Sequence, residues 1–123
     1  VPADVDIVRT TVSLAHSCYE ISFDVTDDQA FSIQRALLNE PTQRPLTHDI
    51  LTDVLNGFNI TVNQVRIERF GDDIYYARAF VQRGDRLLDL DLRPSDAIAL
   101  SLRTKTTLYI NQSMLQEKGD YIC

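Results

Sequence analysis

Two aspartates, Asp89 and Asp91, stand two residues apart in the run LLDLDL, which alternates apolar and acidic side chains. In an extended strand, residues at this spacing point to one face, and their Cα atoms lie roughly 6–7 Å apart. Two carboxylates at that separation can contact one divalent ion, because hard cations such as Mg²⁺ prefer carboxylate and water ligands. We therefore expect Asp89 and Asp91 to be ligands of Mg²⁺ or Mn²⁺. The alternative is a pair of solvated strand carboxylates.

The stretch RPSDAIALSLR follows directly, and its second half has the pattern of a buried helix. Pro94 suits the first turn of that helix, and we expect Ser95 or Asp96 to cap the free backbone N–H groups. Capping does not explain Arg93, which precedes the helix. An arginine at a helix N-terminus can help to bind an anion such as phosphate, or it can pair with Asp96 or Asp49.

A second polar helix start is THD, with Thr47 as the expected cap and His48 and Asp49 in the first turn. A histidine can act as a base at neutral pH without tuning, although many surface histidines have no such role. We predict that His48 and Asp49 lie close to Arg93, because both helix starts are more polar than capping requires. Two converging N-termini would favour a phosphate, whereas an ion pair that only joins the helices predicts the same proximity.

These residues must be positioned by a mixture of strands and helices. Alternating hydrophobicity predicts strands, and the 3.6-residue period predicts helices. We expect an extended run over residues 5–14, strands over 18–25, 62–70, 74–83, 86–92 and 106–110, and helices over 26–39, 47–57, 95–103 and after Asn111. Short turns between the middle strands indicate an antiparallel meander. The predicted fold is α+β: an antiparallel-rich mixed sheet with three main helices packed on it, in one compact domain over residues 1–123.

The same patterns predict which side chains face the core. Thr26 and Gln29 form a capping box at the start of the first helix. The inward positions of the first two helices are expected to be Ala30, Ile33, Leu37 and Leu38, then Ile50, Leu51, Val54, Leu55 and Phe58. In the last strand of the meander, Leu88, Leu90 and Leu92 are expected to face the core, which directs the two aspartates to the opposite face.

That opposite face of the meander collects aromatic, basic and acidic side chains. Its expected members are Arg66, Glu68, Tyr76, Arg78, Phe80, Asp89, Asp91 and Arg93. Three interpretations stay open: a solvated face with cross-strand ion pairs, a homodimer patch that uses Tyr76, Arg78 and Phe80, or a binding site. Two aromatic side chains on the non-core side favour the homodimer if they form one patch.

Charge and cysteine content limit the possible partners. The net charge is −6, and residues 1–60 hold nine acids against three bases, while residues 61–123 hold nine of each. The chain therefore lacks the basic surface that is usual for non-specific nucleic-acid binders. Cys18 and Cys123 form no metal or disulfide pattern, so we expect reduced thiols. No apolar run is long enough to span a bilayer and no secretory signal is visible, so we expect a cytoplasmic protein without a membrane partner.

Three stretches carry a resemblance to a known family. RPLTHDILTDVL (residues 44–55) and LDLDLRPSDAIALSLRTKTTLYI (residues 88–110) resemble the bifunctional nuclease domain family, and ISFDVTDDQAFSIQRAL (residues 21–37) fits the unit that precedes them. The resemblance covers about residues 20–115. It implies a compact α+β homodimer that cleaves DNA and RNA with little sequence preference. The recurring polar residues of the family match Arg44, His48, Asp49, Asp91, Arg93, Ser95 and Asp96. One departure is the acidic stretch DVTDD, where the family has a glycine.

The sequence thus predicts a metal-assisted phosphodiesterase that acts on nucleic acid. Asp89 and Asp91, together with Asp96, would hold the metal, and His48 would act as general acid or base. Arg93 would stabilise the charge on the phosphate in the transition state. The predicted catalytic set is His48, Asp49, Arg93 and Asp96, and the predicted substrate contacts are Arg44, Arg78 and Ser95. The alternative, favoured by the acidic balance, is a non-catalytic dimeric interaction or small-ligand module in which the same residues cap helices and join the subunits.

Overall fold

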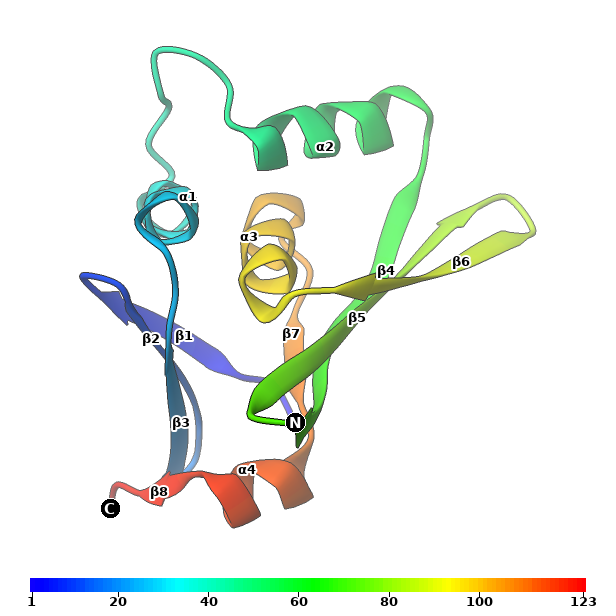
Figure 1. The fold of residues 1–123 in the computed structure, drawn as a ribbon. Helices are drawn as coiled ribbons and strands as arrows, with labels where there is room; N and C mark the ends of the chain where they lie inside the picture. Colours follow the sequence, from blue (N-terminus) through cyan, green and yellow to red (C-terminus); the bar gives the residue numbers. More distant parts are fainter.

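The structure, a computed structural model, describes all 123 residues and contains two four-stranded sheets and four helices (Figure 1). The strands are β1 (Asp4–Val8), β2 (Thr11–His16), β3 (Tyr19–Asp24), β4 (Thr61–Gly71), β5 (Ile74–Arg83), β6 (Arg86–Leu92), β7 (Leu108–Ile110) and β8 (Asp120–Tyr121). The helices are α1 (Asp27–Leu38), α2 (Thr47–Gly57), α3 (Pro94–Thr104) and α4 (Gln112–Lys118). The predicted compact α+β class is confirmed, and its strands divide into two sheets.

The two sheets differ in how their strands pair. The first has the order β1–β2–β3–β8 and is antiparallel throughout. The second has the order β6–β5–β4–β7, and only β7 pairs in parallel, with β4. The extended run predicted over residues 5–14 is a hairpin, because the chain reverses at Arg9, whose φ is 58°. The meander of β4, β5 and β6 follows the prediction.

Helix α3 lies at the centre of the fold, with α1, α2 and both sheets around it (Figure 1). Ile98 and Leu100 of α3 are buried, as are Leu14 of the first sheet and Ile67 of the second. They belong to one continuous hydrophobic core. Full burial of each such side chain contributes about 1.5–3 kcal/mol, so α3 holds the two sheets and the outer helices together.

The helix starts are only partly as predicted. Thr26 and Gln29 form the expected capping box of α1. Thr47 does not cap α2, because it is the first helical residue, and the carboxylate of Asp49 instead accepts a hydrogen bond from the backbone N–H of Leu46. Pro94 is the first residue of α3, as expected.

The predicted caps of α3, Ser95 and Asp96, are also wrong. Arg93 occupies the N-cap position, and its side chain makes no capping hydrogen bond to the backbone. The reason is that Asp96 lies within the first turn, where its carboxylate is bound by Arg93 and by His48.

Several apolar side chains predicted to be internal are exposed. Only Leu55 of the predicted stripe on α2 is buried. Five exposed apolar side chains lie on α2, at its C-cap and on the core side of β6, and we call them the apolar surface: Ile50 (54%), Leu51 (37%), Val54 (47%), Phe58 (62%) and Leu88 (57%). On α1, Leu37 and Leu38 are exposed as well. The cause is the arrangement of the elements: α2 covers α3 along one edge, and the β5–β6 hairpin extends beyond α3 (Figure 1).

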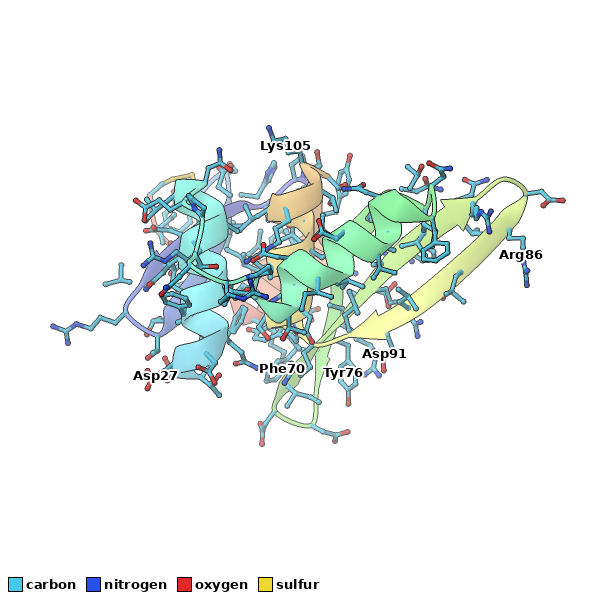
Figure 2. The ribbon with its side chains drawn as sticks, turned by 90° about the horizontal axis from the view of Figure 1, so that it is seen from above. Asp27, Phe70, Tyr76, Arg86, Asp91 and Lys105 are labelled. Atoms are coloured by element: carbon cyan, nitrogen blue, oxygen red, sulfur yellow. A yellow bond between two sulfur atoms is a disulfide. The ribbon has the colours of Figure 1, made fainter.

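The strand register places the two aspartates of β6 as predicted. Pairing between β5 and β6 is continuous from Ala77 opposite Leu92 to Arg83 opposite Arg86. No bulge interrupts β6, so Asp89 and Asp91 project from the face opposite Leu88, Leu90 and Leu92. Figure 2 shows Asp91 near the base of the hairpin and Arg86 at its far end. The two register shifts in the meander lie in β4 instead.

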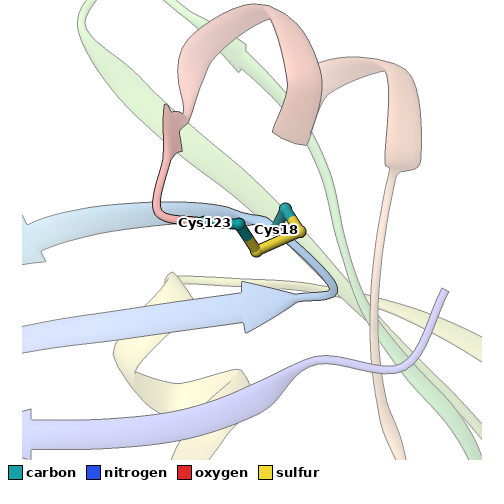
Figure 3. Close-up of a disulfide and its surroundings, with 2 residues drawn as sticks. All are labelled: Cys18 and Cys123. Carbon is teal, nitrogen blue, oxygen red and sulfur yellow. A yellow bond between two sulfur atoms is a disulfide. The ribbon is translucent and has the colours of Figure 1, made fainter.

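The two cysteines form a disulfide, which corrects the expectation of reduced thiols (Figure 3). Pairing of β3 with β8 places Tyr19 opposite Tyr121, and it brings the Cα atoms of Cys18 and Cys123 to 5.2 Å. No spacing rule could have revealed this pair, because 105 positions separate its members. The cytoplasmic location stays a prediction. None of the helices has the length and apolar character needed to cross a membrane.

Replacing both cysteines by serine is expected to lower the free energy of unfolding by about 2–4 kcal/mol, because the crosslink closes a long loop in the unfolded chain. Urea unfolding of the variant and of the oxidised protein measures the difference. Added reductant should lower the stability of the wild-type protein to that of the variant and leave the variant unchanged. Equal stability of the variant and the oxidised wild-type protein would contradict the prediction.

Candidate active site

Four side chains from α1, α2, α3 and the N-cap of α3 form one hydrogen-bonded series, which we call the polar chain: Ser32, His48, Asp96 and Arg93. The hydroxyl of Ser32 on α1 lies 2.7 Å from Nδ1 of His48 on α2. The other ring nitrogen of His48, Nε2, lies 2.9 Å from Oδ1 of Asp96 on α3. Arg93 donates from Nε to Oδ2 of Asp96 at 2.8 Å and from Nη2 to Oδ1 at 3.1 Å. The predicted proximity of His48 and Arg93 is confirmed, with Asp96 between them.

The local sequence explains how these side chains meet. His48 and Asp96 both lie in the first turn of their helices, so the two N-termini converge. Ser32 lies mid-helix on the inward side of α1, beside the buried Ile33. Sequence reasoning missed Ser32, because a serine next to an apolar stripe carries no chemical signal until its partner is known.

The charge of Asp96 fixes the protonation of the polar chain. Burial raises the pKa of Asp96, but the hydrogen bonds from Arg93 and His48 outweigh it and hold the pKa below its usual value. An ionised carboxylate only accepts hydrogen bonds, so Nε2 of His48 must carry a proton. In neutral His48, Nδ1 is therefore the unprotonated nitrogen, and it accepts a hydrogen bond from the hydroxyl of Ser32.

Exposure increases along the polar chain toward the solvent. Ser32 is 5% exposed. The exposed fractions of the side chains are 15% for His48, 23% for Asp96 and 68% for Arg93. All four residues line a cavity of about 320 Å³, the polar pocket, whose wall also includes Phe31 of α1. The arrangement connects a buried hydroxyl to a surface guanidinium through a histidine and a carboxylate.

Asp49 points away from the polar pocket and pairs with Arg103, a residue that sequence reasoning missed. Arg103 donates from Nε to Oδ1 of Asp49 at 2.8 Å and from Nη2 to the backbone carbonyl of Ser32 at 3.2 Å. The hydrogen bond from Arg103 lowers the pKa of Asp49, with burial opposing it and the Leu46 N–H adding to it. This pair joins α1, α2 and α3. Of the two alternative partners considered for Arg93, Asp96 is the one that it binds, and Asp49 is not.

The residues predicted on the meander have other partners. Arg78 binds Glu68 at 3.1 Å and Asp89 at 2.9 Å, which gives the cross-strand ion pairs of the solvated-face interpretation. Asp91 is exposed and makes no ion pair. No three His, Cys, Asp or Glu side chains are placed to share one metal ion. The structure thus does not bring Asp89 and Asp91 together with Asp96, and a requirement for Mg²⁺ or Mn²⁺ stays a prediction.

The other two predicted substrate-binding residues, Arg44 and Ser95, differ in their exposure to solvent. Arg44 is exposed in the segment between α1 and α2, and its side chain makes no ion pair. Ser95 is only 4% exposed and lies in the wall of a second pocket that also includes Arg93 and Asp91. Arg93 therefore belongs both to the polar chain and to the wall of this second pocket, together with Asp91 of β6.

Fold and site together define a small α+β domain in which three helices assemble a serine–histidine–aspartate–arginine chain beside a pocket. Residues 17–122 match the family model of the bifunctional nuclease domain, and the chain belongs to this family. The resemblance expected from the three sequence stretches is confirmed.

Three relatives share between 26% and 32% of aligned residues with this chain. An uncharacterized protein of Mycobacterium tuberculosis is 32% identical over 76 residues, which cover 62% of this chain and 44% of the relative. Bifunctional nuclease 1 of Oryza sativa subsp. indica is 26% identical over 98 residues, covering 77% of this chain and 30% of the relative. Bifunctional nuclease 2 of Arabidopsis thaliana is 27% identical over 90 residues, which cover 71% of this chain and 27% of the relative. The chain therefore spans less than half the length of these relatives.

Replacing Asp49 by asparagine is expected to lower the free energy of unfolding at pH 7 by about 1–3 kcal/mol, because Arg103 loses a charged partner. The folded-state pKa of Asp49 lies below the ordinary value of 3.8, so its contribution is present above pH 3.8 and disappears as the pH falls through the lowered pKa. Urea unfolding from pH 7 to pH 2 measures this. Asp4→Asn on exposed β1 is the control, and a difference for Asp49→Asn that does not decrease in acid would contradict the prediction.

Proposed function

We propose that the protein cleaves phosphodiester bonds of DNA and RNA with little sequence preference. The observation that carries the proposal is the polar chain, which places a hydroxyl, a base and an arginine in the wall of one pocket. Membership of the bifunctional nuclease domain family and the printed names of the plant relatives support the same activity.

In this proposal Arg93 binds the phosphate. Two of its nitrogens are held by Asp96, which fixes the guanidinium plane, while Nη1 makes no hydrogen bond and the side chain is 68% exposed. A fixed guanidinium suits a phosphate oxygen, and the start of α3 adds a favourable dipole. The ion pair between Arg93 and Asp96 therefore positions the phosphate-binding group beside His48.

His48 is then the base that acts on Ser32. Nδ1 takes the hydroxyl proton while Ser32 Oγ forms a bond to phosphorus, and the bond from phosphorus to the leaving oxygen breaks. The proton on Nδ1 passes to the leaving oxygen. In the second half, His48 takes a proton from water, the water oxygen bonds to phosphorus, and Ser32 leaves with the proton. Asp96 holds the ring in the required tautomer, which is the role of an orienting carboxylate.

A divalent metal is a separate part of the proposal. Bound near Asp91, Mg²⁺ or Mn²⁺ would neutralise charge on the phosphate. Asp89 and Asp96 already have arginine partners, so Asp91 is the carboxylate of this group that remains free for an ion. The steps assigned to Ser32 and His48 do not require the metal, and a chelator tests its contribution.

His48→Gln and Ser32→Ala are each expected to lower nuclease activity at least 100-fold, because each removes one partner of the proton transfer. Cleavage of labelled single-stranded DNA and RNA by highly purified protein, with and without chelator, measures the effect. His16→Gln is the matched control, since the side chain of His16 hydrogen-bonds to the carbonyl of Pro2 and lies on β2, outside the polar chain. The control should cleave like the wild-type protein, and equal loss in all three variants would show that the loss does not come from the polar chain.

Arg93→Lys separates binding from folding. Lysine keeps the charge but loses the planar fork, so we expect activity to decrease at least tenfold while the melting temperature changes little. A lower melting temperature with full activity per folded molecule would contradict the phosphate-binding role. Full activity of Ser32→Ala and His48→Gln would show that the polar chain is a structural connection, as the non-catalytic alternative requires.

We also propose that the protein is a homodimer that joins through the apolar surface. Its members lie on α2 and on the core side of β6, and neither element is covered there by the rest of the chain. Asp53 on α2 and Arg86 at the end of the hairpin make no ion pair within the chain. In a two-fold dimer, α2 of one protomer could pack against β6 of its partner with these charges opposed. The predicted Tyr76–Arg78–Phe80 face is less suitable, because Arg78 already binds Glu68 and Asp89 and the guanidinium of Arg66 already lies over the Phe80 ring.

Val54→Asp is expected to convert the dimer to a monomer at micromolar concentration, because it places a charge within the apolar surface. Light scattering measures the mass. Leu38→Asp, which places a charge on an exposed leucine of α1, is the control and should remain dimeric. A monomeric wild-type protein would contradict the proposal.

A further inference from the structure

A second cavity, of about 580 Å³, lies next to the polar pocket, and Arg93 belongs to the walls of both. Its wall contains three aromatic side chains, Phe23 of β3 and Tyr75 and Tyr76 of β5, so we call it the aromatic pocket. The start of α3 closes one side through Pro94 and Ser95. The volume is within the usual range for sites that bind small organic groups. The proposed mechanism uses Arg93 and Asp91 of this wall and leaves its aromatic side chains without a role.

Each of the three aromatic side chains packs against another side chain. The ring centroids of Phe23 and Tyr75 are 5.6 Å apart, and those of Phe70 and Tyr75 are 4.8 Å apart. The guanidinium of Arg69 lies over the ring of Tyr76, 3.7 Å from its centroid. A ring that is fixed on one side can offer its free side or edge to a planar ligand without losing further conformational entropy.

Charge at the pocket shows which part of a nucleotide fits. Three carboxylates, Asp24, Asp73 and Asp91, lie in its wall, and Arg93 is the single basic residue among the lining side chains. The acidic wall would repel a phosphate inside the pocket, whereas the arginine at its boundary attracts one. An uncharged aromatic base with N–H donors fits the interior, because carboxylates accept hydrogen bonds from such donors. Figure 2 shows Tyr76 and Asp91 close together on neighbouring strands.

We propose that the aromatic pocket binds an unpaired nucleobase, while the phosphate attached to that nucleotide lies at Arg93. This inference rests on the proposed function, since it needs a nucleic acid as substrate. A base in a duplex is paired and stacked and cannot enter the pocket without leaving the helix, so the substrate is single-stranded. Stacking on aromatic side chains tolerates every base, which agrees with cleavage of little sequence preference.

The test measures binding to the His48→Gln variant, which cannot cleave the probe, by fluorescence anisotropy. The probes are a labelled single-stranded DNA oligonucleotide, its duplex, and an abasic strand with the same phosphates. We expect the single strand to bind roughly 5- to 100-fold more tightly than the abasic strand, the range that stacking provides. Adding Tyr76→Leu should reduce single-strand binding to the abasic level and leave abasic binding unchanged. Tyr121→Leu on β8, outside the pocket, is the control.

The outcomes separate the two proposals. Equal affinity for the single strand and the abasic strand overturns the base pocket and leaves the phosphate site intact. Equal affinity for single strand and duplex also overturns it. If no probe binds and the wild-type protein cleaves none, the proposed function fails as well.

A second measurement does not depend on the folding of a variant. The fluorescence of a 2-aminopurine base within the strand is expected to decrease on binding to the His48→Gln protein at one nucleotide position, because the base stacks on the pocket aromatics. No change at any position would overturn the proposal.

Discussion

The arrangement of the site depends on one ionised carboxylate, that of Asp96, at the start of the central helix. It accepts hydrogen bonds from His48 on α2 and from Arg93 before α3. Burial of the group would favour its neutral form, and the two donors outweigh that tendency. The charge therefore sets the His48 tautomer, holds the guanidinium plane and joins two helix starts. Removal of either donor would leave a half-buried charge with fewer partners, which is destabilising.

A second ion pair supports this arrangement from the opposite side. Arg103, whose side chain is only 7% exposed, joins Asp49 on α2 to the backbone carbonyl of Ser32 on α1. Since Ser32 and Asp49 are thereby fixed relative to α3, the hydroxyl of Ser32 stays within reach of His48. The two aspartates occupy the same position in the first turn of their helices, but they serve different purposes: Asp96 faces the pocket, and Asp49 holds the helices together.

Sequence patterns predicted the α+β class, the meander, the capping of α1 and the proximity of His48 and Arg93, because those features follow from local periodicity and helix-start chemistry. Three features required tertiary contacts. Ser32 and Arg103 have significance only through partners on other helices. The Cys18–Cys123 disulfide depends on the pairing of β3 with β8. The exposed face of α2 has the same apolar stripe as a buried helix, so periodicity alone could not show that it lacks a neighbour within the chain.

The central claim is that Asp96 keeps the proton of neutral His48 on Nε2, so that Nδ1 can take the proton of Ser32. Long-range ¹⁵N–¹H NMR of the histidine ring observes this directly, in protein labelled with ¹⁵N and at a pH where His48 is neutral. We expect a protonated Nε2 and an unprotonated Nδ1 in the wild-type protein, and loss of this single tautomer in Asp96→Ala. A protonated Nδ1 with an unprotonated Nε2 in the wild-type protein would contradict it.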